Sequence, residues 1–337
     1  MAEARAAGLR STSYSLHASR AGLRAADRRR RRDAGLPENE GQIDTMRSTR
    51  SSYSLALSLV ASLLTAPSAR AADATVPGTF ATVQAALNGA VDADNDGKIT
   101  IQLGAATFTG AFLVARDNIE LVGAGATTIL RAPTGTAEIP VLSALLVSGF
   151  EVRDLTIRGS AFKPGLDVSD TEGLVVENVR IELASEAAGF VGCNFASLSN
   201  LTVIDCGAGI LLRDSIGIEL TNSTFTSNDA EAVLVRGCTN TLVSNIVCSD
   251  NLGAGVFVRR STATVLSNVT STDNLEDGLF IREVVGIVID NCTLTGNGGF
   301  GVFTRRSIGV DFDGAAAGVQ GPVGTNTITG NSLGVTN

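Results

Sequence analysis

The sequence predicts an all-β solenoid, a single-stranded parallel β-helix of about ten coils with a capping helix at its N-terminal end. Three observations predict this fold. A motif recurs every 23 residues through the second half of the chain. Each copy holds short runs of β-forming residues separated by Asn, Gly, Ser or Asp, with no helical pattern between them. Aromatic residues make up only 4% of the chain while Gly occurs 37 times, which disfavours a helical bundle.

Three positions define the repeat. Arginine occupies the first, at Arg213, Arg236, Arg259, Arg282 and Arg305, and asparagine the other two, at Asn222, Asn245, Asn268 and Asn291 and at Asn228, Asn251, Asn274 and Asn297. Asn200 and Asn178 continue the first asparagine series at a spacing of 22, and Asp154 is expected on the next rung. One unit cannot bury its apolar face, so we expect stacked coils that rise about 4.8 Å each. Asparagine tolerates left-handed backbone at a turn and can bond to its copies on neighbouring coils.

Alternation along the strands predicts two inward stacks and one outward strip. The inward stacks are Ile210, Val233, Val256, Leu279 and Val302, and then Leu212, Val235, Val258 and Ile281. The outward positions hold Leu211, Leu234, Phe257, Phe280 and Phe303 beside the five repeating arginines, and we call this surface the Phe–Arg strip. Exposed phenylalanine beside stacked cations is unfavourable as plain surface, and it therefore indicates a binding face.

The first seventy residues predict a targeting segment. Residues 1–45 are expected to be a mis-assigned or disordered leader, with Met46 as the true start. Residues 46–71 have the features of a signal peptide: Arg47 and Arg50, the apolar run 55–64, and an A-x-A site at 69–71. The β-helix domain is then expected over residues 72–337, in a secreted, periplasmic or extracellular protein without a transmembrane segment.

Removing residues 1–71 changes the available chemistry. The remaining chain has no His, Tyr, Trp or Met, and its 14 basic and 28 acidic residues give a formal charge of −14. Such an acidic chain is not expected to bind nucleic acid. The five cysteines are an odd number, so at least one has no partner within the chain.

The repeats, of the G-I-x-L-x-x-S type, resemble those of the right-handed parallel β-helix superfamily of pectate lyases and their relatives, from about Ala72 to Asn337. The segment 80–87, followed by runs at 99–103 and 118–123, looks like the start of many such proteins, in which an amphipathic helix plugs the end of the solenoid. Residues 314–324 look like an insertion in the last turn, before the final run 325–331.

The resemblance implies several activities, which the residue inventory then narrows. Three of these activities need residue types that are absent after residue 71. They are polygalacturonate hydrolysis through a Gly-His-Gly motif, alginate epimerisation through His and Tyr, and copper binding through His or Met. The methylesterase motifs Gln-Asp and Asp-Phe are not matched. Two chemistries stay open. One is a lyase, in which the resemblance implies a Ca²⁺-assisted β-elimination with Arg259 or Arg282 as base. The other, less favoured, is hydrolysis by a carboxylate pair.

Carboxylates gather at one predicted turn, where Asp250 and Asp273 occupy equivalent positions on neighbouring coils. They are the candidate cation site or catalytic pair, and a solvated acidic turn is the alternative interpretation. Asp311 and Asp313, on either side of a Phe312 expected to point outward, are a weaker candidate of the same kind.

A second candidate metal site is the run 92–97. Asp92, Asp94 and Asp96 followed by Gly97 match the first half of a calcium loop, in which oxygen ligands alternate before a sharp turn. The twelfth position is Leu103 rather than the bidentate Glu, so a plain polar turn is the alternative. Ca²⁺ is the only cofactor that the sequence suggests.

The Phe–Arg strip carries the functional prediction. We expect it to bind an extracellular, acidic polysaccharide, with Arg213, Arg236, Arg259, Arg282 and Arg305 facing carboxylates and Phe257, Phe280 and Phe303 facing sugar rings. The alternatives are a non-catalytic surface or adhesion module that docks a cell-surface protein, and a structural solenoid whose arginine stems cover the rings. We expect a monomer.

Overall fold

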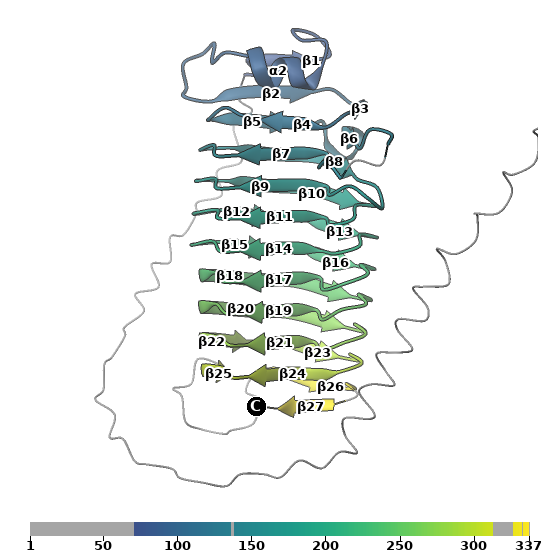
Figure 1. Ribbon diagram of the computed structural model, residues 1–337, viewed down its shortest axis with the longest axis vertical. Coiled ribbons are helices and arrows are strands. Elements are labelled where there is room, and N and C mark those ends of the chain that lie inside the picture. The colour runs from purple at the N-terminus through teal and green to yellow at the C-terminus, as the bar shows by residue number, and fades with distance from the viewer. Residues whose placement is uncertain (1–70, 136–137, 313–325, 332, 337) are drawn as a thin grey trace, which may run out of the picture. The chain divides into compact units, whose positions relative to one another are not determined.

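The computed structural model describes residues 71–135, 138–312, 326–331 and 333–336, and these form a two-sheet parallel solenoid (Figure 1). The expected leader, the signal peptide up to residue 70 and the expected insertion at 314–324 lie outside the described residues. The fold class predicted from the 23-residue period is confirmed.

Sheet B has ten parallel strands, one from each coil, in a single uninterrupted stack. Figure 1 shows most of these strands one below another at the front of the molecule. In spatial order they are β4 (Phe112–Val114), β7 (Leu142–Leu145), β9 (Leu166–Ser169), β11 (Ala188–Val191), β14 (Ile210–Arg213), β17 (Val233–Arg236), β19 (Val256–Arg259), β21 (Leu279–Arg282), β24 (Phe300–Arg305) and β27 (Leu333–Thr336).

Sheet A has 17 strands and forms the remaining two sides of each coil. The first of these two sides holds β1 (Ala74–Val76), β2 (Ile99–Leu103), β5 (Ile119–Val122), β12 (Ser197–Ser199), β15 (Glu219–Thr221), β22 (Val285–Asp290) and β25 (Ile308–Phe312). The second holds β3 (Thr107–Thr109), β6 (Ile129–Arg131), β13 (Thr202–Ile204), β16 (Thr224–Thr226), β23 (Thr293–Thr295) and β26 (Thr327–Thr329). Four long strands run through both: β8 (Glu151–Arg158), β10 (Val175–Glu182), β18 (Thr239–Ser249) and β20 (Thr262–Thr272).

The inward stacks form the core as predicted. Val233 pairs with Ile210 above it and with Val256 below it, and all members of both predicted stacks are at most 2% exposed. Parallel pairing in constant register keeps each side chain over its equivalent on the next coil. The apolar core therefore runs continuously through the stack.

The two asparagine series play different structural roles. The series 178, 200, 222, 245, 268 and 291 has φ between 49° and 54°, which places it at the left-handed corner between the two sides of sheet A. Asp154 occupies the preceding rung with φ 57° and accepts a bond from Asn178. These side chains are exposed, and Asn268 Nδ2 donates to Asn245 Oδ1 over 3.0 Å.

The second series points inward and is buried. Asn228, Asn251, Asn274 and Asn297 are at most 1% exposed and are absent from the left-handed region. Each Nδ2 donates to the Oδ1 of the next asparagine, over 2.8 Å for Asn228 to Asn251 and for Asn251 to Asn274. The same Oδ1 atoms accept backbone N–H groups, so this ladder satisfies polar groups inside the solenoid.

A short helix closes the N-terminal end. Helix α2 (Val83–Gly89) begins after Thr82, whose side chain accepts a bond from the Ala85 N–H, and it buries Val83, Ala86 and Leu87. It lies at the top of the stack beside β1 and β2 (Figure 1). The expected cap and the expected strands after it are confirmed; the 3₁₀ turn η1 (Gly125–Thr127) follows β5.

All five cysteines are buried and none is joined in a disulfide, which agrees with the odd number. Burial raises the pKa of the Cys193 and Cys206 thiols to about 11, so both are neutral thiols at physiological pH. One orientation was predicted wrongly: Phe312 aligns with the buried Ile289 and packs against the core, because the inward position of β25 falls on it rather than on Asp311. Asp313 lies outside the described residues.

Candidate functional site

The Phe–Arg strip runs along the outer face of sheet B. The five arginines pair in register from β14 to β24, as do Leu211, Leu234, Phe257, Phe280 and Phe303. None of these apolar side chains is buried, and the arginines are half-buried or exposed. The sequence thus predicted the composition and the register of the strip correctly, because its period equals one coil.

The phenylalanine rings stack on one another. Phe257 and Phe280 have centroids 4.3 Å apart and planes 6° apart, and Phe300 stacks on Phe303 at 5.2 Å and 13°. Phe280 and Phe303 are tilted by 41° at 5.2 Å. Because the ring faces contact neighbouring rings, the strip offers a ridge of ring edges to a ligand, rather than the stacking platforms that the sequence suggested.

One carboxylate organises the lower arginines. Glu283 Oε2 lies 2.8 Å from Arg260 Nε, and its Oε1 lies 3.2 Å from Arg282 Nε and 3.9 Å from Arg306 Nη1. The hydrogen bond from Arg260 is the main cause that lowers the pKa of Glu283, and the nearby guanidinium charges lower it further. A single negative charge therefore serves three cations, and the lower part of the strip stays positive.

Arg259 is the least compensated cation of the strip. Within the part of the chain that the structure describes, no ion pair involves Arg236, Arg259 or Arg305. The Nε atom of Arg259 is also buried without a hydrogen-bond partner. Loss of solvent lowers the pKa of Arg259, and the positive charges of Arg260, Arg282 and Arg236 lower it further against a weaker opposing effect of Glu283.

A feature that the sequence analysis missed lies at the upper end of the strip. Asp167 on β9 aligns with Gly189 on β11 and with Leu211 on β14, the first apolar residue of the strip. A Cβ atom on Gly189 would lie 3.0 Å from Glu186 Oε1 and 3.7 Å from Asp167 Oδ1. Gly189 is itself buried, so the Glu186 carboxylate already lies against this position and a side chain there would be crowded. We call Asp167, Glu186 and Arg213 the upper triad.

Burial, and for Glu186 also the charge of Asp167, raises the pKa values of the two carboxyls of this triad. Burial raises the pKa of Asp167, and the Arg213 guanidinium offsets part of the rise. Burial also raises the pKa of Glu186, the charge of Asp167 raises it further, and Arg213 again opposes the shift. Neither carboxylate has a hydrogen-bond partner among the described residues, whereas Arg213 Nε lies 3.7 Å from Asp214 Oδ2.

Asp250 and Asp273 lie at a different place. Both are exposed, with φ of 57° and 55°, at the corner that follows the second side of sheet A. Their equivalence on neighbouring coils follows from the pairing of Ser249 with Thr272. Asp273 Oδ1 lies 2.2 Å from where a Cβ of Gly296 would be, so this carboxylate covers the next corner. Their catalytic role stays a prediction.

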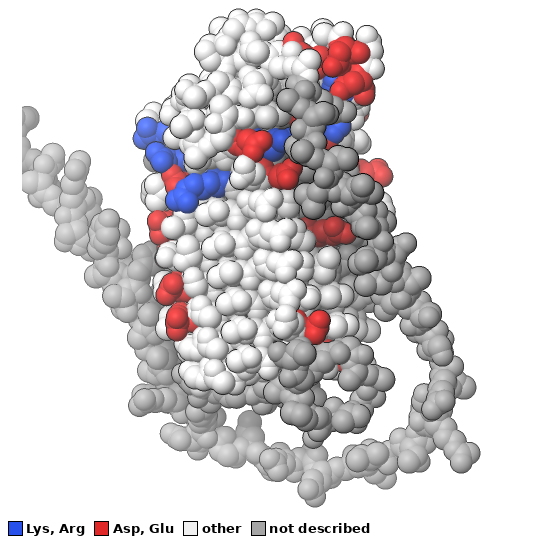
Figure 2. Space-filling model, turned by 180° about the vertical axis from the view of Figure 1, so that it is seen from behind, with Lys and Arg blue, Asp and Glu red and all other residues white. Residues whose placement is uncertain are grey.

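The side of the molecule opposite sheet B differs in charge from the Phe–Arg strip. In Figure 2 the basic side chains on that side are confined to the upper coils, and the lower coils show acidic side chains only. Sheet A contributes Arg131, Arg158 and Arg180 to the upper coils, and Glu182 binds the last two at 2.7 Å. Its lower outward positions hold Thr or Ser, for example Thr270 and Thr272 of β20 and Thr293 and Thr295 of β23. The positive strip therefore belongs to sheet B.

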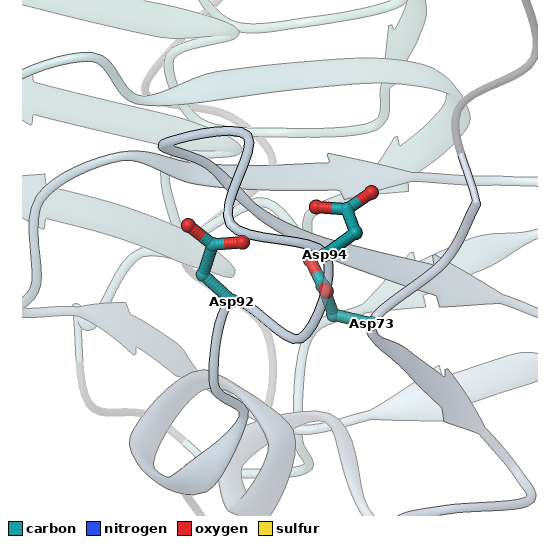
Figure 3. A group of neighbouring side chains, drawn as sticks. All are labelled: Asp73, Asp92 and Asp94. Atoms are coloured by element: carbon teal, nitrogen blue, oxygen red, sulfur yellow. The ribbon is translucent and has the colours of Figure 1, made fainter.

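The candidate calcium loop brings together a different set of carboxylates from the one predicted. Ligand atoms of Asp73, Asp92 and Asp94 lie within 4.8 Å of one another (Figure 3), and Asp73 comes from the segment before β1. Asp96 is not in this group; its Oδ1 accepts the Lys98 N–H at 2.9 Å. Leu103, at the twelfth position, is buried in β2. Asp73 thus supplies the third carboxylate that sequence spacing could not reveal.

Backbone N–H groups already bind these carboxylates. Asp73 accepts from Ala93 and Thr100 at 2.7 and 2.8 Å, and Asp92 accepts from Gly97 at 3.0 Å. Carboxylate oxygens in a loop are suitable ligands for a hard cation such as Ca²⁺. Half-exposed carboxylates that accept hydrogen bonds from several backbone N–H groups are also stable without a bound cation. The donor chemistry therefore fits Ca²⁺, at low affinity.

The stacked coils, their constant register and the one-sided strip define a parallel β-solenoid whose sheet B carries the elongated Phe–Arg strip. Residues 186–336 match the family described as the right handed beta helix region. The described residues therefore have the right-handed parallel β-helix fold that the repeats suggested. No curated protein matches this chain.

Several solved structures share this fold. The enzymatically active domain of tailspike protein 2 from bacteriophage CBA120 has a TM-score of 0.59 at 14% identity, over 79% of this chain and 43% of that chain. ORF18 of Geobacillus virus E2 has a TM-score of 0.52 at 13% identity, over 68% and 56%. An alginate lyase from Paenibacillus sp. str. FPU-7 has a TM-score of 0.51 at 14% identity, over 75% and 96%. The chain spans about half the length of the two viral proteins. At these identities the likeness concerns the fold.

None of the helices in the described ranges has the length and apolar character needed to cross a bilayer.

Proposed function

We propose that this protein binds an acidic polysaccharide outside the cytoplasm, along the Phe–Arg strip. The observation that carries the proposal is the unbroken register of five arginines on one face, three of which form no ion pair within the described residues. Two similar structures are named as an enzymatically active tailspike domain and an alginate lyase, which supports carbohydrate as the ligand class. The predicted signal peptide supports a periplasmic or extracellular location.

The strip suits a linear polyanion for geometric reasons. Guanidinium groups repeat at about 4.8 Å along the axis, close to the length of one sugar unit, so successive uronate carboxylates can each meet one arginine. The ridge of ring edges beside them offers an apolar wall to the C–H groups of the sugars. Because the strip extends over five successive coils, it suits an extended chain rather than a small molecule.

Cleavage by β-elimination is the second part of the proposal, with Arg259 as the base. In this reaction the base removes the proton α to the uronate carboxylate, the C4–O bond breaks, a C4–C5 double bond forms, and the leaving oxygen takes a proton from water. A lowered pKa favours Arg259 over Arg282, because Arg282 is held by Glu283. Arg236 and Arg282 on the adjacent coils would stabilise the carboxylate charge that grows as the proton leaves.

The binding proposal is tested with the full chain. Polygalacturonate, alginate and a neutral glucan are titrated with and without Ca²⁺, while absorbance near 235 nm reports unsaturated ends. We expect binding to one or both polyuronates, weakened by salt, and none to the glucan. An increase in absorbance would show lyase activity in addition to binding. Binding without an increase in absorbance would indicate a carbohydrate-binding module. Failure to bind either polyuronate would overturn the proposal and favour a protein partner.

We also propose that Ca²⁺ binds Asp73, Asp92 and Asp94 and stabilises the N-terminal cap. With a millimolar Kd, 10 mM Ca²⁺ should raise the melting temperature by roughly 2–4 °C. The Asp92→Asn variant should lose this rise, while Asp205→Asn, an exposed position with the same change of charge, should keep it. A melting curve indifferent to Ca²⁺ in the wild-type protein would remove the metal from this loop.

A further inference from the structure

We propose that the second side of sheet A is an ice-binding surface. The proposal concerns a face of the solenoid that the Phe–Arg strip does not use, so it goes beyond polysaccharide binding and is independent of it. The face is formed by the outward positions of β13, β16, the second halves of β18 and β20, β23 and β26, and we call it the Thr face.

The Thr face is a grid of two columns. In register, the first column holds Thr202, Thr224, Val247, Thr270, Thr293 and Thr327, and the second holds Ile204, Thr226, Ser249, Thr272, Thr295 and Thr329. The residue between the columns points into the core, since Phe225, Ser271 and Leu294 are fully buried. A Thr-x-Thr motif therefore recurs on four of these six coils, with both side chains on the outside.

The spacing of this grid is the first argument. Neighbouring coils lie about 4.8 Å apart, and residues i and i+2 of one strand lie about 6.6 Å apart. Both distances are close to spacings between oxygen atoms on a prism plane of ice. The pairing continues without a slip from β13 to β26, so the rows stay aligned over six coils. Regular rows in two directions match the surface of a crystal better than they match a dissolved molecule.

The absence of charge is the second argument. None of the twelve grid positions is charged, although 18% of the residues of the chain are. The grid ends at the coil above, where Arg180 and Glu182 occupy the same two columns. In Figure 2 the lower coils show a broad uncharged surface with acidic side chains toward its margins. Because removing a charge from liquid water is costly, a surface that contacts ice must be free of charges.

The chemistry of threonine is the third argument. Thr226 Oγ1 accepts from Ser249 Oγ over 3.3 Å and lies 3.5 Å from Ser227 Oγ, and no other threonine hydroxyl of the face bonds to a described residue. The remaining hydroxyls are left to bind water. Branching at Cβ restricts χ1 of threonine, so its hydroxyl and methyl groups keep fixed positions. Such rows can order water that continues into an ice lattice at a small entropic cost.

A crystalline polysaccharide is the other ordered solid that a regular grid could match. Sugar rings stack on aromatic side chains, and none of the twelve grid positions is aromatic. The composition of the Thr face therefore favours ice over a solid glycan.

The experiment measures thermal hysteresis, the gap between the melting and freezing temperatures of a single ice crystal in a solution of the full chain. We expect the wild type to give a faceted crystal and a gap that increases with protein concentration. Thr272→Tyr places a bulky ring in the middle of the grid and should lose most of the gap. The matched control is Ser267→Tyr on the same strand, β20, because Ser267 follows the buried Leu266 and faces outward on the first side of sheet A. This control should keep the wild-type gap.

Two further measurements make the result specific. Thr272→Ser keeps the hydroxyl and removes the methyl group, so it should reduce the gap by less than Thr272→Tyr does. It also tests the face if circular dichroism shows that the tyrosine variant does not fold. Polyuronate binding by Thr272→Tyr should equal that of the wild type, since the Phe–Arg strip lies on sheet B.

Three outcomes would overturn the proposal. The first is a folded wild type that neither shapes ice nor shows hysteresis, and the second is an equal loss of the gap in Thr272→Tyr and Ser267→Tyr. The third is adsorption to crystalline cellulose or chitin that Thr272→Tyr abolishes, without any effect on ice, because the Thr face would then belong to a solid polysaccharide. None of these outcomes bears on the Phe–Arg strip, whose test is polyuronate binding.

Discussion

Replacing Asn251 with alanine should destabilise the protein by roughly 4 kcal/mol, a large effect for a single polar side chain. The Asn251 amide accepts from the N–H and Nδ2 of Asn228 and donates to Phe225 O at 3.2 Å and to Asn274 Oδ1. Alanine would leave the buried N–H and Nδ2 groups of Asn228 without partners, would remove the side-chain donor to Phe225 O, and would add a cavity.

The matched control is Asn245→Ala, six residues earlier on the same coil. Asn245 is exposed, has φ 52°, and forms one side-chain bond, with Asn268. Alanine there should cost only about 1 to 2 kcal/mol, because it lacks the short polar side chain that lets asparagine tolerate left-handed backbone. Urea unfolding monitored by circular dichroism measures both variants. Equal losses of unfolding free energy in the two variants would show that the buried asparagine ladder stabilises the protein no more than the exposed asparagine series does.

Replacing Arg259 with alanine should reduce the affinity for polygalacturonate by about tenfold or more, since a charge-assisted hydrogen bond in the centre of the strip is lost. If Arg259 is also the base, elimination should fall by a much larger factor than binding, and kcat should decrease more than KM increases. Arg259→Lys, which keeps the charge, should restore most of the binding and only part of the elimination.

Two further variants make this result specific. Arg131→Ala removes an exposed arginine from sheet A and should leave polymer binding unchanged. Glu283→Gln removes the carboxylate that binds Arg260 and Arg282, so it should strengthen the binding of a polyanion. If Arg259→Ala and Arg131→Ala weakened binding equally, the strip would not be the binding surface.

The fold was predictable because the repeat length equals the length of one coil. Arg213 and Arg236 are 23 residues apart and pair directly, so counting along the sequence already gave their register. The same arithmetic placed Leu212 and Val235 in the core. It could not show that Asn222 and Asn228 differ so strongly in burial, because both recur with the same period and only the backbone conformation separates the corner from the interior.

The candidate site was predictable only where it repeats. Asp167 and Glu186 have no counterparts at 23-residue intervals, and they come together beside Gly189, which has no side chain to keep Glu186 away from the sheet. Asp73 reaches Asp92 and Asp94 across a distance in sequence that no local motif covers. The contact of one phenylalanine ring with the next depends on side-chain rotamers, which periodicity does not determine.

The equivalence of the coils makes the length of the binding surface adjustable in whole steps. Because β17, β19 and β21 share one register, duplication of a 23-residue segment would add one arginine and one phenylalanine to the strip without changing their neighbours. Each added coil would extend contact by about one sugar, and multivalent binding strengthens steeply with the number of linked contacts. Tandem duplication or loss of coils thus offers evolution, or an engineer, a way to tune polymer avidity while the core and the cap stay the same.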